Sequence, residues 1–247
     1  MRNFNEEMWK FFDMLLEGDN FSLSRYGDGE FSIINGQDWD AINGGKRKNV
    51  WDFFESDKRY DVSKKLIKES FLNNEEGYFK GIPCQCCLLK EKALSIYDSI
   101  EDKSHLTWAN LFVNGNYKDF NTYFASVLEG RQVFMISHHN SNPKKLPFRV
   151  EEYWRIGDNA WVDDLNLLQD LKDYIEIMEI ENAVFLIAGG PFASIFASEM
   201  WNFNKQNTYI DIGSSLDVYL FGEPTRQYHR FNHKNHSKKC IWFEKEE

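Results

Sequence analysis

Basic residues are in the minority in this 247-residue sequence: 29 lysines and arginines stand against 39 aspartates and glutamates. The formal net charge is therefore −10 at pH 7. Proteins that bind nucleic acid neutralise its phosphates with lysine and arginine, so we expect no nucleic-acid partner. A local basic pocket for a small anion is compatible with this balance.

Long apolar runs are also lacking. No stretch of 18 apolar residues occurs, and acids interrupt the N-terminal segment MRNFNEEMWKFFDMLLEG. We therefore expect no transmembrane segment and no signal peptide. Only four cysteines occur, and Cys84, Cys86 and Cys87 are too close together for an obvious disulfide framework, which favours the cytoplasm. We expect this CQCC segment to be structural, since free cysteine behaves as a small buried hydrophobe.

Proline- or glycine-rich linkers, internal repeats and low-complexity segments are missing as well. What the sequence does contain is 42% hydrophobic residues, enough for a substantial core. Helical and strand periodicities alternate along the chain. The predicted helices cover 4–17, 60–73, 88–100, 118–128 and 161–179; the predicted strands cover 21–26, 77–83 and 131–140; a strand, turn and helix cover 181–201, and a strand with a loop covers 206–222.

This alternation predicts an α/β fold of Rossmann-like topology, with a mostly parallel sheet and helices on both faces. Residues 1–222 are expected to form a single domain. The remaining residues, 223–247, are expected to form a basic, histidine-rich tail that packs on or near the site.

The turn AGGP at 188–191 lies between a predicted strand and a predicted helix. Free backbone N–H groups and the helix dipole at such a start favour an anion, so Gly189, Gly190 and Pro191 are candidate contacts for a diphosphate. The same turn also serves simply to reverse a chain. Asp211 ends the following strand, where an acid would meet the ribose of NAD, but the glycine fingerprint of dinucleotide-binding folds is absent.

The stretch SRYGDGEF at 24–31 has two interpretations. Asp-Gly between alternating apolar residues is typical of a β-hairpin. Alternatively, Asp28 and Glu30 project from one face of an extended segment and bind Mg²⁺ or Mn²⁺. Gly27 and Gly29 would then let the backbone approach a ligand, and Arg25 would neutralise a phosphate.

RYGDGE at 25–30 resembles the R-(F/Y)-G-D-G-E motif of the GT-D-fold glycosyltransferases. Further segments resemble that family in the same order: 81–83 (GIP), 108–110 (WAN), 187–191 (IAGGP) and 209–217 (YIDIGSSLD). The resemblance implies a metal-dependent transferase that uses Mn²⁺ or Mg²⁺, bound by the two acids of the motif. It also implies a nucleotide-sugar donor, with a UDP-sugar favoured, and a glycan or glycoconjugate acceptor hydroxyl.

A transferase that inverts configuration needs a general base. We consider Asp217 first, then Asp211 and His138. Asp217 follows a strand end in a Gly/Ser loop, where Ser214 is a candidate donor contact, although an aspartate there also suits a helix N-cap.

The tail contains the spacing H-x3-H-x2-H-x3-C at His229, His233, His236 and Cys240. These ligand types are chemically sufficient for zinc, but the spacing matches no standard finger. Alternatively, the tail covers the donor phosphates, with Arg226 and His229 as its main contacts.

Two other function classes fit the same residues. A metal-dependent phosphohydrolase would use the same acids and the same anion-binding turn without an acceptor. A non-catalytic nucleotide-binding protein would tolerate loss of Asp28 or Glu30 with little effect beyond affinity.

Overall fold

A parallel sheet forms the centre of the molecule in the computed structural model, which describes residues 3–39, 51–88, 90–230, 232 and 234–242. Within these residues, seven strands pair in parallel in the order β3-β2-β1-β7-β6-β4-β5. The strands are β1 (Ser22–Arg25), β2 (Tyr78–Ile82), β3 (Leu106–Trp108), β4 (Val133–His138), β5 (Glu152–Ile156), β6 (Val184–Ala188) and β7 (Thr208–Asp211).

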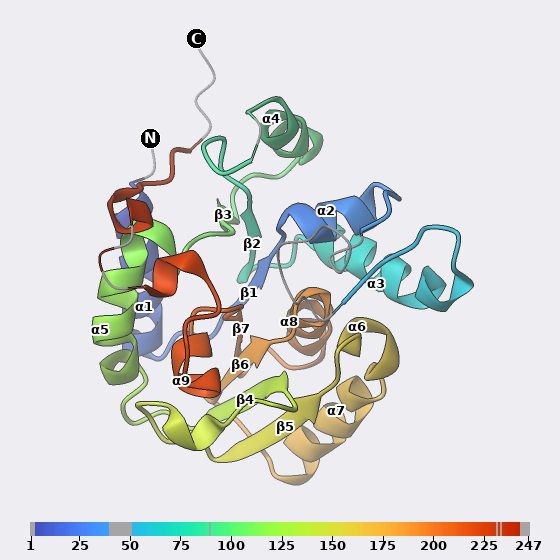
Figure 1. Cartoon of the computed structure of the whole chain (residues 1–247). Coiled ribbons are helices and arrows are strands. Elements are labelled where there is room, and N and C mark those ends of the chain that lie inside the picture. The colour runs from blue at the N-terminus through green and yellow to red at the C-terminus, as the bar shows by residue number, and fades with distance from the viewer. Residues whose placement is uncertain (1–2, 40–50, 89, 231, 233, 243–247) are drawn as a thin grey trace.

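Helices cover both faces of this sheet (Figure 1). They are α1 (Phe4–Glu17), α2 (Asp28–Ile34), α3 (Asp61–Leu72), α4 (Lys90–Ser99), α5 (Tyr117–Val127), α6 (Ala160–Asp163), α7 (Leu167–Ile177), α8 (Pro191–Phe203) and α9 (Asp217–Phe221). Short 3-10 helices are η1 (Lys58–Tyr60), η2 (Asn114–Asn116), η3 (Pro143–Lys145), η4 (Gln227–His229) and η5 (Lys234–Ser237).

The two faces bury separate clusters of apolar side chains, as the period of two along a strand requires. In β6, Val184 and Leu186 pack on the face covered by α1 and α5, whereas Phe185 and Ile187 pack on the face covered by α3, α6, α7 and α8. Because both faces are covered, the strand reads as a continuous apolar run.

The predicted α/β fold with a mostly parallel sheet is confirmed, and most predicted elements occur within a few residues of their predicted bounds. Strands β3 and β5 were not predicted. The prediction of one continuous helix over 161–179 is wrong, because this segment forms two helices, α6 and α7. Asp164 leaves the helical conformation there, and its carboxylate accepts the backbone N–H of Gly157 at 2.7 Å.

The β-hairpin interpretation of residues 24–31 is also wrong. β1 ends at Arg25 and α2 begins at Asp28. The Glu30 carboxylate accepts the Gly27 N–H at 2.9 Å, which is half of a capping box and stabilises the start of a helix rather than a two-residue turn.

Among the described residues, no helix is both long enough and apolar enough to cross a membrane.

We expect the core around α1 to contribute strongly to the free energy of unfolding. Phe12 is fully buried in the cluster on the α1 and α5 face, whereas Leu16, four residues along the same helix, is 62% exposed. Phe12→Ala should therefore lower the free energy of unfolding by about 3–5 kcal/mol. Leu16→Ala is the control, and should change it by less than about 0.5 kcal/mol. Urea denaturation measures both, and equal effects would contradict this packing.

Candidate active site

A pocket of about 810 Å³ lies at the carboxyl ends of the parallel strands. This is the end at which α/β sheets bind their ligands, because loops from several strands converge there. The loops after β1, β4, β6 and β7 all contribute, together with the segment after α9. The candidate site residues that line it are Arg25, Gly27, Asp28, Gly29, Glu30, His138, Gly190, Asp211, Ser214, Asp217 and Arg226.

The base of the pocket contains a buried ion pair between neighbouring strands. Arg25 ends β1 and Asp211 ends β7, and Arg25 Nε lies 3.5 Å from Asp211 Oδ1. Nε donates no hydrogen bond to a described residue, so this attraction is chiefly coulombic. Nη1 donates to the Ala109 carbonyl at 3.1 Å, just beyond β3. Burial raises the pKa of Asp211, while Arg25 and the Gly213 N–H act against that shift.

Gly213 holds the loop after β7 close to this ion pair. Its N–H donates to Asp211 Oδ1 at 2.9 Å, and its φ of +52° favours glycine. A Cβ at this position would lie 1.6 Å from Arg25 Nη2. Glycine is therefore required both by the backbone conformation and by the guanidinium above it.

Asp28 and Glu30 lie on the first turn of α2. The prediction that an extended segment directs both side chains to one face is wrong in its geometry, since residues two apart on a helix point about 200° apart. Both nevertheless line the pocket, Asp28 as an exposed residue. The two carboxylates reach the same space from a helix start rather than from a strand.

Glu30 lies in a partly buried position. Burial raises its pKa to about 7, the Gly27 N–H lowers it, and the charges of Asp211 and Asp28 raise it further. A cation placed among these acids would remove the repulsion that favours the protonated form.

The carboxylates suit a divalent ion that brings other ligands with it. Among the described residues, no three carboxylates have oxygens within 4.8 Å of one another. Mg²⁺ characteristically binds one or two carboxylates and completes its shell with water and phosphate oxygens. Two carboxylates that line one pocket, as those of Asp28 and Glu30 do, are the type and number of protein ligands that such an ion takes.

Asp217 faces the pocket from the start of α9. It is 8% exposed, and its carboxylate accepts a hydrogen bond from the Thr225 hydroxyl. Burial raises its pKa to about 6, with Thr225, Arg226 and Arg25 acting in the opposite direction. The alternative role as an N-cap does not apply, because Asp217 is the first residue within α9 and Leu216 is the cap.

His138 ends β4 and also lines the pocket. Its Nε2 lies 2.7 Å from Asp158 Oδ1, and its Nδ1 accepts the Asn140 N–H at 3.2 Å. Both ring nitrogens are thus engaged with protein groups. This leaves Asp217 better suited than His138 to accept a proton from a ligand.

The AGGP turn contributes two residues, Ala188 and Gly190, to the pocket lining. Gly190 lies at the wall with a φ of +55°, and a Cβ there would lie 3.0 Å from Trp51 Nε1. Gly189 instead packs against Ile156, and Pro191 is buried as the first residue of α8. The strand, glycine turn and helix are as predicted, but the approach to the helix start is narrow because Trp51 lies beside it.

His229 lies behind the pocket wall and does not line it. Its Nε2 donates to the Ser214 carbonyl at 2.8 Å, and its Nδ1 accepts the N–H groups of Thr225 and Arg226 at 3.2 and 3.1 Å. Burial lowers its pKa to about 4, so it is neutral at pH 7. It therefore positions the tail against the loop after β7, whereas Arg226 itself faces the pocket.

The tail zinc set is not assembled. Both nitrogens of His229 have protein partners, and His236 Nε2 donates to the Tyr228 carbonyl at 2.6 Å. Cys240 lies beside other cysteines instead, and His233 lies outside the described residues.

The sequence alone does not single out the aromatic and amide side chains that line the pocket. Trp39 and Trp51 stack with ring centroids 5.8 Å apart and line one side of the pocket, and Asn110 and Tyr228 line another. The helix at Asp28 was detectable in principle, since a glutamate three residues after Gly27 is the acidic half of the capping-box pattern.

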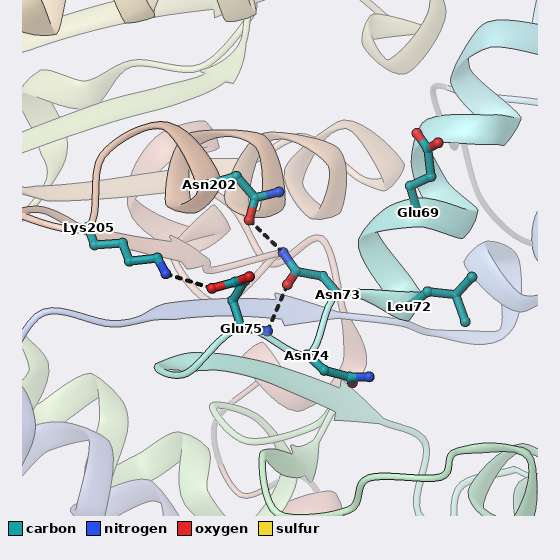
Figure 2. Close-up of a pocket in the computed structure, with 7 residues that line it drawn as sticks. All are labelled: Glu69, Leu72, Asn73, Asn74, Glu75, Asn202 and Lys205. Carbon is teal, nitrogen blue, oxygen red and sulfur yellow. Dashed lines mark hydrogen bonds and ion pairs between the residues drawn. The ribbon is translucent and has the colours of Figure 1, made fainter.

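A second pocket, of about 640 Å³, lies at the amino ends of the strands between α3 and α8 (Figure 2). Its polar groups have partners: Asn73 donates to Asn202 at 3.1 Å, and Lys205 pairs with Glu75 at 2.7 Å. Glu69 pairs with Lys65 at 3.6 Å, and Asn74 accepts a hydrogen bond from Lys80 at 2.6 Å. We assign no site to it, because these groups are already satisfied.

We expect His229 to make stability depend on pH. Its pKa is near 6.5 when unfolded and about 4 when folded, so the unfolded chain binds more protons between these values. The stabilisation is present above pH 6.5 and lost as pH falls towards 4. Melting temperatures from pH 7.5 to 4.5 should fall more steeply for the native protein than for His229→Gln. Parallel curves would contradict the assigned environment.

No protein-family model matches the sequence, and no curated protein matches it. Solved structures do. One, described as domain of unknown function 1792 with a distinct glycosyltransferase fold, has a TM-score of 0.55 at 11% identity, over 97% of this chain and 90% of the other. Another, described as a new glycosyltransferase of this domain from Streptococcus sanguinis, has a TM-score of 0.56 at 14% identity, over 97% and 94%. A selenomethionine structure of the domain has a TM-score of 0.53 at 10% identity, over 97% and 96%. The chain therefore has this glycosyltransferase fold, as the resemblance of its motifs predicts.

Proposed function

We propose that this protein is a metal-dependent glycosyltransferase that moves a sugar from a nucleotide sugar to the hydroxyl of a glycan or glycoconjugate. One observation carries the proposal: Arg25, Asp28 and Glu30 open into a single pocket at the carboxyl ends of the strands, in a chain with a glycosyltransferase fold. A UDP-sugar is the favoured donor, on the resemblance of the motif at 25–30.

The donor diphosphate would occupy the side of the pocket formed by Arg25 and Gly190. Arg25 supplies positive charge at the end of β1, and Gly190 precedes the start of α8, whose dipole favours an anion. Arg226 adds a second guanidinium from the tail. These groups would stabilise negative charge where the leaving diphosphate accumulates it.

Asp28 and Glu30 would hold the metal ion, and Mn²⁺ or Mg²⁺ bound there would neutralise part of the charge that develops on the leaving diphosphate. The stacked pair Trp39 and Trp51 offers apolar ring surface on the same side of the pocket, suited to a sugar face or a nucleobase.

Asp217 would act as general base in an inverting transfer. Its carboxylate accepts the proton of the acceptor hydroxyl while that oxygen bonds to the anomeric carbon. The bond from this carbon to the diphosphate oxygen breaks, and its electron pair leaves on the phosphate. A pKa of about 6 keeps Asp217 mostly ionised at pH 7 and basic enough to accept the proton.

We expect Asp28→Asn to lower kcat/KM for donor turnover by at least about a hundredfold, since charge stabilisation by a metal is worth several kcal/mol. The control is Asp170→Asn, which changes an exposed acid in the first turn of α7, outside the pocket lining. Both variants should keep the melting temperature of the native protein within a few degrees. Full activity in Asp28→Asn would overturn the metal assignment.

The pH dependence should identify the base. Because Asp217 must be ionised, kcat/KM should fall as pH decreases through about 6. Thr225→Val removes a hydrogen bond that lowers this pKa, so the midpoint should move to higher pH. Thr122→Val, which removes an exposed hydroxyl on α5, is the control and should leave the midpoint in place. A flat profile between pH 5 and 8 would exclude Asp217 as the base.

A thermal-shift screen against nucleoside diphosphates and nucleotide sugars, each with and without Mn²⁺, tests the donor class. A manganese-dependent shift with a nucleotide sugar supports the transferase. Product analysis then separates the alternatives: release of phosphate or free sugar without an acceptor indicates a phosphohydrolase. Binding that survives Asp28→Asn, with no turnover of any donor, indicates a non-catalytic nucleotide-binding protein.

A further inference from the structure

The four cysteines of the chain lie together at the edge of the candidate active site. Cys84, Cys86 and Cys87 follow β2, and Cys240 comes from the C-terminal segment, 153 residues after Cys87. Their sulfurs all lie within 4.8 Å of one another. Every cysteine in the sequence is thus used in one cluster, whose members are distant in the chain.

The spacing of the sulfurs matches a single tetrahedral ion. Four thiolates at about 2.3 Å from one zinc lie about 3.8 Å from each other. Here Cys84 and Cys86 are 3.1 Å apart, and Cys87 and Cys240 are 3.9 Å apart. An iron–sulfur cluster distributes its thiolates over several irons, which spreads them further. All four are free cysteines, too far apart in these pairs for a disulfide.

Two asparagine amides point at the sulfurs. Asn110 Nδ2 lies 3.8 Å from the sulfurs of Cys84 and Cys240. Asn114 Nδ2 lies 3.7 Å from those of Cys87 and Cys240. Amide donors arranged around sulfur are what thiolate ligands require of their surroundings, because the charged sulfur accepts hydrogen bonds far better than a thiol.

Asn114 is buried and adopts a left-handed backbone conformation, which asparagine tolerates better than most residues. Its φ is +56° and it is 6% exposed. The neighbouring Gly115 N–H donates to the Lys238 carbonyl at 2.9 Å, which fixes the C-terminal segment beside it. The Lys238 side chain hydrogen-bonds Cys87, placing a positive charge next to the sulfurs.

We propose that Cys84, Cys86, Cys87 and Cys240 bind one Zn²⁺ in a closed structural site. Four thiolates fill all tetrahedral positions, which is the pattern of structural rather than catalytic zinc. Four thiolates and one Zn²⁺ carry a net charge of −2, which Lys238 and the two amides partly offset.

This ion would tie the C-terminal segment to the loop after β2. That segment supplies Arg226 and Tyr228 to the pocket, and Trp242 at its far end packs edge-on against Trp108 of β3 at 4.6 Å. The zinc would therefore fix one wall of the pocket. The inference depends on the sulfur geometry and stands whether or not the protein transfers a sugar.

The test is the metal content of the full chain, purified with a reductant and without chelator. Plasma mass spectrometry should give about one zinc per chain. Exchange with Co²⁺ should give the sulfur-to-cobalt charge-transfer and d–d absorption bands of a tetrahedral thiolate site. A reduced protein that contains no zinc and takes up neither Zn²⁺ nor Co²⁺ would overturn the proposal.

Two variants separate a zinc ion held by the cysteines from one held by the tail histidines. Cys87→Ser changes the most exposed of the four cysteines, so the fold should persist while zinc affinity falls by more than about tenfold. His236→Gln is the matched control, and should retain the zinc because His236 bonds to Tyr228 instead. Loss of zinc in His236→Gln but not in Cys87→Ser would assign the ion to the tail histidines. Two protected disulfides in the native protein, found by thiol titration, would also overturn the proposal.

Discussion

The buried contact between Arg25 and Asp211 is the constraint on which the site depends. One guanidinium reaches the ends of three strands: its own β1, the Asp211 carboxylate of β7 and the Ala109 carbonyl after β3. A buried charge left without its partner costs several kcal/mol, so these strand ends have little freedom to separate. Gly213 completes the arrangement, because only a residue without Cβ fits over the guanidinium. The close contact between Gly213 and the Arg25 guanidinium therefore fixes the position of the loop that leads to Ser214 and Asp217.

Around this contact the molecule concentrates acids in a desolvated space. Glu30, Asp211 and Asp217 all have raised pKa values with burial as the largest cause. The charges of Arg25 and Arg226 act against the shift at Asp217. An apo protein that keeps carboxylates together in this way loses stability to their desolvation and mutual repulsion. The acids and the arginines line one pocket, where the proposed cation and polyanionic donor would together offset these costs.

The sequence predicted the elements with strong periodicity, including α1, β6 and the glycine turn before α8, because burial on a sheet dictates their patterns. It did not predict β3 and β5, which form the two edges of the sheet. β3 has only three residues, and only one residue of β5 is buried. Asp28 and Glu30 were identified as site residues by motif, but their placement on a helix depends on one capping hydrogen bond. The roles of His229 and Cys240 depend on partners far along the chain, and no local pattern encodes those.

The position of β7 in the sheet affects how the chain folds during synthesis. β7 lies between β1 and β6, and pairs Tyr209 with Ser22 from near the opposite end of the chain. A nascent chain that has emerged only as far as α8 therefore has two apolar strands with unpaired edges and no partner for either. Such edges recruit other chains, and pairing over this sequence separation is slow. Among the described strands β7 is synthesised last, and it joins the two halves of the sheet. The interval before its arrival is therefore when this protein is most exposed to aggregation.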